Sequence, residues 1–212
     1  MGKRGRVVET RVAEILLDIN AVELSPEAPF TWSSGIVSPI YCDNRKIIGD
    51  VGARSEIADA FAEMIKVQAP DAEIIAGTST AGIPHAAFIS ERLGLPMCYV
   101  RGSRKKHGKG NQIEGAAVDG KKVVLIEDLI STGGSSLEAA EALKENGADL
   151  LTVIAIFTYG IPRADEAFKD TGLSYHTLST LDALIDVSMD RGAIDEKQKE
   201  AILQFRQKLS QK

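Results

Sequence analysis

The chain has 212 residues, of which 44% are hydrophobic and 26% are charged, and its formal net charge is -5. These values are typical of a globular protein with its own hydrophobic core, and they exclude disordered, collagen-like and low-complexity chains. Because a net acidic chain is a poor general ligand for nucleic acid or anionic lipid, we expect neither as a partner. We expect one domain over residues 1–212.

The cysteines and the apolar segments restrict the class of protein further. The two cysteines, Cys42 and Cys98, are too few for a disulfide scaffold or a four-cysteine zinc site. The longest near-continuous apolar stretch, residues 150–157, is too short to cross a bilayer. The basic N-terminus lacks the apolar segment of a signal peptide. We therefore expect a cytoplasmic protein that contacts no membrane.

Hydrophobic periodicity predicts helices and strands in alternation over most of the chain. Helical spacing covers residues 6–19 and 50–67, and the proline- and glycine-containing segment 20–49 between them is expected to be irregular or β. Further elements are expected in chain order: a strand at 73–77, a helix at 82–94, a strand at 96–100, a polar loop at 101–115, a strand at 122–126, a helix at 134–146, a strand at 150–157, and helices at 162–169 and 195–210.

Apolar strands that alternate with helices are typical of an α/β fold in which helices cover both faces of a central parallel sheet. Ligands bind such sheets outside the carboxyl ends of the strands. The residues that follow each predicted strand are therefore the first candidates for a functional site.

The strongest candidate site follows the predicted strand 122–126. Glu127 and Asp128 come directly after it, and residues 131–135, Ser-Thr-Gly-Gly-Ser, lead into the next predicted helix. Paired carboxylates accept hydrogen bonds from sugar hydroxyls or hold hydrated Mg²⁺, and a small-residue turn at a helix N-terminus cradles a phosphate. The pattern is neither a Walker loop nor a Rossmann fingerprint. A solvated turn that only caps a helix would not need both carboxylates and both glycines.

Two loops provide further candidates. Five of the 25 Lys and Arg residues fall between Arg101 and Lys109, among glycines that make the loop mobile. Such a loop can close over a polyanion, although a solvated charge run or a local nucleic-acid patch has the same composition. The small residues 77–82 let backbone amides approach a pyrophosphate, or form an ordinary capped turn.

Residues 123–135 resemble the phosphoribosyl-pyrophosphate (PRPP) motif of the type I phosphoribosyltransferases. Three other segments, residues 30–45, 76–84 and 97–115, are similar to the substrate segment and loops of the orotate phosphoribosyltransferase family. The resemblance implies the type I fold, with residues 20–49 in a small N-terminal substrate-binding hood. It implies transfer of a phosphoribosyl group from PRPP to orotate with Mg²⁺, giving orotidine 5′-monophosphate and pyrophosphate in pyrimidine synthesis.

The resemblance also implies a role for particular residues. The catalytic residues would be Lys105, His107 and Asp128. PRPP would be bound by Arg101, Lys105, Lys106, His107, Glu127, Asp128, Leu129, Ile130, Ser131, Thr132, Gly133, Gly134 and Ser135. Orotate would be bound by Tyr41, Cys42, Ser131 and Arg163. No residue would ligate the metal directly, because Mg²⁺ would be held mainly by PRPP and water. A homodimer would share the basic loop between subunits.

The chain departs from the family pattern at three places. Ser33 stands where many members have a lysine, and no lysine occurs near Ala81 where many have another. Many members also have an orotate-binding arginine after the strand that corresponds to residues 150–157. The only arginine near that position here is Arg163, which is out of register. Two other functions remain open from the sequence: a phosphoribosyltransferase for another base, and a PRPP-binding regulator without catalysis.

Overall fold

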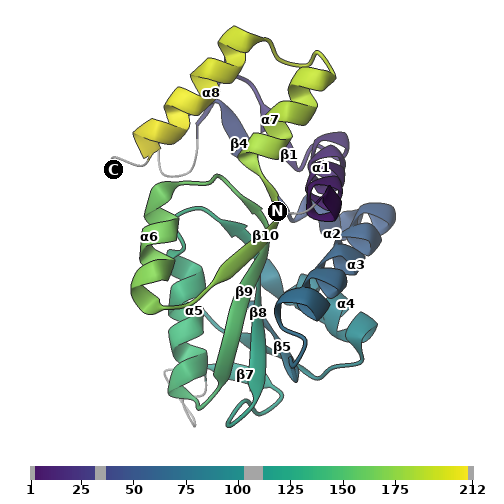
Figure 1. Cartoon of the computed structure of the whole chain (residues 1–212), viewed down its shortest axis with the longest axis vertical. Coiled ribbons are helices and arrows are strands. Elements are labelled where there is room, and N and C mark those ends of the chain that lie inside the picture. The colour runs from purple at the N-terminus through teal and green to yellow at the C-terminus, as the bar shows by residue number, and fades with distance from the viewer. Residues whose placement is uncertain (1–2, 32–36, 103–111, 210–212) are drawn as a thin grey trace.

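The computed structural model describes residues 3–31, 37–102 and 112–209, and it centres on a six-stranded sheet (Figure 1). The strand order is β10-β9-β8-β5-β6-β7. The strands are β5 (Ile74–Thr78), β6 (Met97–Val100), β7 (Ile113–Gly115), β8 (Lys122–Ile130), β9 (Asp149–Thr158) and β10 (Tyr175–Thr180). All neighbours run parallel except β7, which is antiparallel to β6.

The predicted central parallel sheet is present, and one antiparallel edge strand that the sequence did not predict is added to it. Strand β7 lies inside the segment predicted as a polar loop, and it pairs with β6 through Cys98 opposite Gly115 and Val100 opposite Ile113. Its three residues are at most partly buried, so they lack the continuous apolar run by which the buried strands are recognised. The sheet is therefore mixed.

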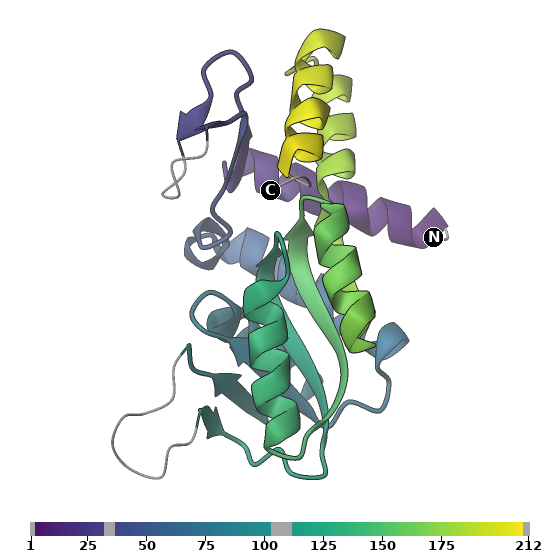
Figure 2. The ribbon, with the colours of Figure 1, turned by 90° about the vertical axis from the view of Figure 1, so that its left-hand side faces the viewer.

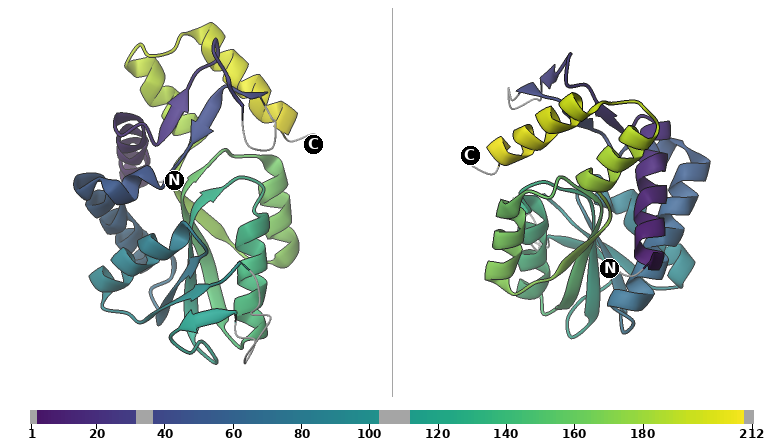
Figure 3. Two further views of the ribbon diagram at one scale, coloured as in Figure 1. Left: turned by 180° about the vertical axis from the view of Figure 1, so that it is seen from behind. Right: turned by 45° about the horizontal axis from the view of Figure 1, so that its top comes forward.

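Helices cover both faces of the sheet because neighbouring residues of each central strand point to opposite faces (Figures 1 and 3). In β8, Val124 and Ile126 join one apolar cluster, whereas Val123 and Leu125 join the other. The first cluster includes residues of α1 (Lys3–Asp18), α3 (Val51–Gln68) and α4 (Gly82–Leu93), and the second includes residues of α5 (Gly134–Glu145) and α6 (Pro162–Thr171).

Most predicted elements are confirmed to within a few residues, with one functional correction. Strand β8 continues to Ile130, so Glu127 and Asp128 lie in the last part of the strand rather than in a loop after it. The sequence did not predict α2 (Lys46–Gly49), β10 (Tyr175–Thr180) or α7 (Leu181–Asp190). The short α2 has too few residues to show a helical period.

Two small antiparallel sheets form a separate layer at one end of the molecule (Figure 2). They pair β1 (Val22–Leu24) with β4 (Ile40–Cys42), and β2 (Phe30–Thr31) with β3 (Val37–Ser38). We call residues 20–49 the hood. Helices α7 and α8 (Glu196–Leu209) lie at the same end, and Gln198 donates a 3.2 Å hydrogen bond to Glu27 of the hood.

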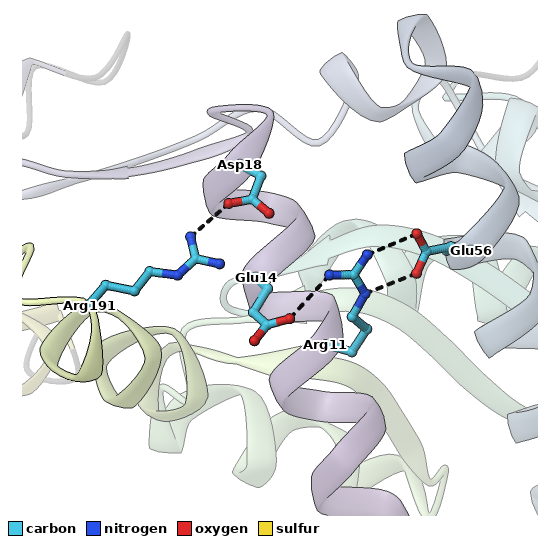
Figure 4. Close-up of polar contacts among 5 residues, drawn as sticks. All are labelled: Arg11, Glu14, Asp18, Glu56 and Arg191. Atoms are coloured by element: carbon cyan, nitrogen blue, oxygen red, sulfur yellow. Dashed lines mark hydrogen bonds and ion pairs between the residues drawn. The ribbon is translucent and has the colours of Figure 1, made fainter.

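Exposed ion pairs join α1 to its neighbours (Figure 4). Arg11 donates two 3.0 Å hydrogen bonds to Glu56 of α3 and one of 3.1 Å to Glu14. Arg191, at the end of α7, pairs with Asp18 at 2.7 Å. Because these groups are solvated, each pair contributes little stability, about 0–1 kcal/mol. Among the residues described, no helix combines the length and the apolar character needed to cross a membrane.

The first turn of α4 packs so closely on β8 that only glycine fits at position 82. A Cβ atom there would press on the carbonyl oxygen of Ile126 and lie 2.5 Å from Oγ1 of Thr78. We expect Gly82→Ala to lower the free energy of unfolding by about 1–3 kcal/mol, the usual cost of overpacking. Gly49→Ala is the matched control, because a Cβ at Gly49 has no neighbour within 4 Å. Urea unfolding measures both, and equal midpoints for the two variants would contradict this packing.

Candidate active site

A cleft of about 490 Å³ lies between the hood and the carboxyl ends of the central strands. Its lining comes from three parts of the chain: the end of the hood, the loop between β5 and α4 together with the first turn of α4, and the end of β8. The lining residues are Cys42, Asp43, Arg45, Ile48, Thr80, Ala81, Pro84 and Asp128. The size is in the ordinary range for a small-molecule site.

The cleft lies where the direction of the sheet topology reverses. After β5 the chain continues to β6 on one side, and β8 then returns to the other side of β5. The helices that follow these strands, α4 and α5, pack on opposite faces. Between such diverging connections the carboxyl ends of two parallel strands leave a crevice, which is the usual ligand site of this architecture.

Glu127 spans this crevice with a buried carboxylate, 5% exposed. Its Oε1 accepts hydrogen bonds from Thr78 Oγ1 at 2.6 Å and from the Asp128 N–H at 3.1 Å. Its Oε2 accepts from Ser135 and Ser136 at 3.3 and 3.1 Å. These donors fill the accepting capacity of a carboxylate, so a sugar hydroxyl would have to replace one of them. The weakest is the 3.3 Å bond from Ser135.

Asp128 differs from its neighbour because its side chain lines the cleft. Burial, and next the negative charge of Glu127, raise the pKa of the Asp128 carboxyl well above its usual range. Its backbone carbonyl accepts a 2.7 Å hydrogen bond from Nδ2 of Asn44, which fixes the hood to the end of β8. The two carboxylates therefore differ in access: Glu127 is buried among protein donors, whereas Asp128, although it also bonds to Glu127 and to backbone N–H groups, lines the cleft.

The turn after β8 has the geometry of an anion site. Gly133 is the N-cap of α5 with φ of +83°, and no side chain caps the helix. A Cβ at Gly133 would also lie 2.9 Å from the Phe168 ring. The first amides of a helix lack intrahelical partners and carry partial positive charge. Because Thr132, Gly134 and Ser135 are exposed, an anion has access to this turn. We call residues 131–135 the phosphate turn.

The chain matches known proteins over most of its length. A sequence model of the phosphoribosyl transferase domain matches residues 52–189. Over 199 residues the chain is 55% identical to the orotate phosphoribosyltransferase of Staphylococcus saprophyticus, covering 94% of this chain and 98% of the relative. The chain belongs to the orotate phosphoribosyltransferase family.

Solved structures agree with this family assignment. The orotate phosphoribosyltransferase of Aeropyrum pernix superposes with a TM-score of 0.73 at 28% identity, over 87% of this chain and 99% of that one. The UMP synthase of Leishmania donovani gives a TM-score of 0.79 at 26% identity over 94% of this chain. The match spans only 42% of that longer protein. The predicted fold and family are confirmed.

The structure brings some of the predicted orotate phosphoribosyltransferase residues together and separates others. Cys42 and Asp128 share the cleft, and Tyr41 precedes Cys42 on β4. Arg163 is exposed at the start of α6 and is not among the lining residues. The side chain of Ile130 is buried in the core, so only its backbone can face a ligand. Leu129 likewise packs against the core.

The basic loop is described only at its two ends. Arg101 pairs with Glu114 of β7 at 3.5 Å and remains partly exposed. The predicted catalytic residues Lys105 and His107, with Lys106, lie outside the described residues. Their roles stay predictions.

Sequence reasoning missed several residues that shape the site. Asp43 and Arg45 line the cleft, and Thr78 and Ser136 hold Glu127. For the first pair, the sequence signal was their place at the end of segment 30–45, which resembles the family's substrate segment, but no role was assigned to either residue. Ser136 gave no signal, because a serine in a predicted helix is expected to face solvent.

Two further groups in or near the site are neutral at neutral pH. Burial, with the charges of Asp128 and Asp43, raises the pKa of the Cys42 thiol, so Cys42 is a contact residue rather than a nucleophile. Burial lowers the pKa of His85 to about 4. Its ring packs beside Phe61 with centroids 6.5 Å apart.

The shifted Asp128 carboxyl predicts a measurable cost to stability. The pKa of Asp128 is higher in the folded than in the unfolded protein. The contribution of this carboxyl to stability is therefore fully present below the unfolded pKa, about 3.9, and is lost as the pH rises through the folded pKa. We expect Asp128→Asn to raise the free energy of unfolding at pH 8 by about 1 kcal/mol or more, because one pKa unit corresponds to about that energy. The gain should vanish near pH 4.

Asp43→Asn is the control for this experiment. The hydrogen bond from Arg45 lowers the pKa of Asp43, so this carboxylate contributes stability above its unfolded pKa. Its substitution should lower stability at pH 8. Denaturant unfolding at pH 4, 6 and 8 measures both variants, and stabilisation by Asp43→Asn or destabilisation by Asp128→Asn would contradict the account.

Proposed function

We propose that the cleft and the phosphate turn form the site where the chain transfers a phosphoribosyl group from PRPP to orotate, releasing pyrophosphate. The observation that carries this proposal is that an uncapped helix start at residues 131–135 follows directly after Asp128, which lines the cleft, so that one edge of the sheet offers a carboxylate for sugar hydroxyls and amides for a phosphate. The family assignment supports the same reaction. A different base, or PRPP binding without chemistry, is an outcome of the assay below.

The ribose 5-phosphate part of PRPP is assigned to the end of β8 and the start of α5. The amides of residues 131–135 donate to the 5′-phosphate, and the dipole of α5 favours its charge. Asp128 accepts hydrogen bonds from the ribose hydroxyls. Glu127 keeps the turn in shape and contacts ribose only if the Ser135 bond opens.

The pyrophosphate part is assigned to Arg101, to the amides of residues 78–82, and to Lys105, Lys106 and His107 of the basic loop. Cationic groups stabilise the charge that grows on a leaving pyrophosphate. Thr80 and Ala81 line the cleft next to Asp128, which supports this side of it for the reacting end of PRPP.

Mg²⁺ fits this site as a partner of the substrate. Within the described part of the chain, no three His, Cys, Asp or Glu side chains are grouped to hold a metal ion. Mg²⁺ commonly keeps several waters and binds through one or two carboxylates and substrate phosphates. Of the two carboxylates in the cleft lining, Asp43 is paired with Arg45, so Asp128 is the one nearer to hand for hydrated Mg²⁺. When bound, the ion neutralises pyrophosphate charge.

The chemistry needs no covalent intermediate with the protein. A ring nitrogen of orotate attacks the anomeric carbon of PRPP as the bond to pyrophosphate breaks, with positive charge developing on the sugar. The Asp128 carboxylate lies near that charge, and the cations of the basic loop take up the charge on the leaving group. Tyr41, Cys42, Ser131 and Arg163 are the predicted orotate contacts. Because orotate is already an anion, a general base has little to do.

We also propose a cytoplasmic homodimer in which each basic loop reaches the partner's cleft. Sedimentation and activity of mixed inactive variants test this part. Rescue of activity on mixing a Lys105 variant with an Asp128 variant is the expected result, and no rescue would contradict a shared loop.

The assay for the reaction follows the loss of orotate absorbance after addition of PRPP and Mg²⁺. Pyrophosphate release is measured for orotate and for uracil, adenine and hypoxanthine as comparison bases. We expect pyrophosphate release with orotate and little with the others. Release with a purine only would assign another base. Binding of PRPP without release for any base would favour a regulator.

Lys105→Ala tests the basic loop. We expect turnover to fall by a factor of about 10²–10³, as for the loss of one charge-stabilising donor. The matched control is Lys66→Ala, which removes an exposed lysine that pairs with Glu63 on α3. Unchanged turnover in the Lys105 variant would remove the loop from the mechanism.

Asp128→Asn tests the ribose contact. We expect calorimetry to show weaker binding of PRPP with Mg²⁺ and a smaller change in the affinity for orotate, because only PRPP carries the ribose hydroxyls that donate hydrogen bonds to Asp128. Equal losses for both substrates would contradict the assignment.

A further inference from the structure

We propose that Arg45 binds the carboxylate of the pyrimidine substrate and so sets the preference for orotate over bases without that group. The inference rests on the proposed function and identifies one residue of the same site. It departs from the prediction that Arg163 binds orotate.

The first argument is position. Arg45 lines the cleft together with Asp128, Cys42 and Thr80, and it is the one cationic residue among the lining residues described. Orotate carries its carboxylate on the ring carbon next to the nitrogen that is glycosylated. A group that binds the carboxylate must therefore lie close to the ribose of PRPP, which is assigned to Asp128. Arg45 meets this requirement, and Arg163, exposed on α6, is outside the lining.

The second argument is preorganisation of the guanidinium. Asp43 Oδ1 accepts a 2.6 Å hydrogen bond from Arg45 Nε and a 3.2 Å bond from the Arg45 backbone N–H. The Asp43 side chain is only 17% exposed, so it fixes the direction of the arginine. Within the described residues, the Nη1 and Nη2 atoms have no hydrogen-bond or ion-pair partner. These atoms form the edge that binds a carboxylate through two parallel hydrogen bonds.

The third argument is charge. Asp43 and Asp128 give the lining two carboxylates against one guanidinium, so an anionic base would be repelled without a cation aimed at it. The lysine that many family members have near Ala81 is absent, and Ala81 itself lines the cleft. The side chain of Arg45 is 68% exposed, so an incoming ligand has access to its terminal edge.

The test uses Arg45→Gln and Arg45→Lys in the full chain, with steady-state kinetics at saturating PRPP. Orotate carries the carboxylate both in the bound ground state and in the transition state. Removal of the Arg45 contact should therefore weaken both states equally, which raises KM and leaves kcat nearly unchanged. We expect KM for orotate to rise about 10- to 100-fold in Arg45→Gln with kcat changed less than about threefold, since a hydrogen bond to a charged group is lost. Lysine should restore part of the affinity. The Kd of PRPP with Mg²⁺, measured by calorimetry, should stay unchanged.

Two further variants make the result specific. Arg191→Gln removes another exposed arginine that pairs with one aspartate and is not among the lining residues of the cleft, so it should leave KM for orotate unchanged (Figure 4). Arg163→Gln tests the competing assignment. An orotate KM in Arg45→Gln within twofold of the parent chain would overturn the proposal. So would a KM rise confined to Arg163→Gln, or an equal loss of PRPP affinity in Arg45→Gln.

The outcome also separates this inference from the proposed function. If the parent chain releases pyrophosphate with orotate and Arg45→Gln matches it, only the role of Arg45 is wrong. If the parent chain itself does not react with orotate, the proposed function and the inference both fail.

Discussion

The buried carboxylate of Glu127 is the constraint on which the site depends. It joins three segments that the chain brings to one crevice: Thr78 at the end of β5, the end of β8, and the serines at the start of α5. Burial of a carboxylate costs several kcal/mol unless hydrogen-bond donors satisfy it, and each missing hydrogen bond costs about 1–3 kcal/mol. The phosphate turn is therefore held in one shape before any anion arrives, and binding need not supply that ordering.

The hood and the sheet form one site because polar contacts fix the hood segment 42–45. Asn44 donates to the carbonyl of Asp128, while Asp43 orients Arg45, which lines the same cleft as Asp128. Residues 43–45 thus couple the position of the Arg45 cation to the end of β8. Since Asn44 is buried, 1% exposed, movement of the hood would cost its hydrogen bond.

The sequence was sufficient for the parts of the fold that depend on continuous apolar runs. Strands β5, β8 and β9 are buried on both faces, and the helices between them keep a clear hydrophobic period. The order of these elements along the chain and the place of the phosphate turn were therefore predictable. Strand β7 was not, because an edge strand of three partly exposed residues looks like a loop. The different roles of Glu127 and Asp128 were also hidden, since adjacent carboxylates in a strand point to opposite sides, and the sequence does not show that Thr78, Ser135 and Ser136 donate to Glu127. Arg45 was missed because the cleft that it lines forms only when the hood folds over the sheet.

The central claim is that the crevice between β5 and β8 holds the pentose of PRPP with its 5′-phosphate on the start of α5. A crystal structure of the chain soaked with PRPP and Mg²⁺ tests it most directly. The account predicts the 5′-phosphate within hydrogen-bond distance of the amides of residues 131–135, and the ribose hydroxyls against Asp128. A 5′-phosphate bound elsewhere, or an empty turn at saturating PRPP, would contradict it.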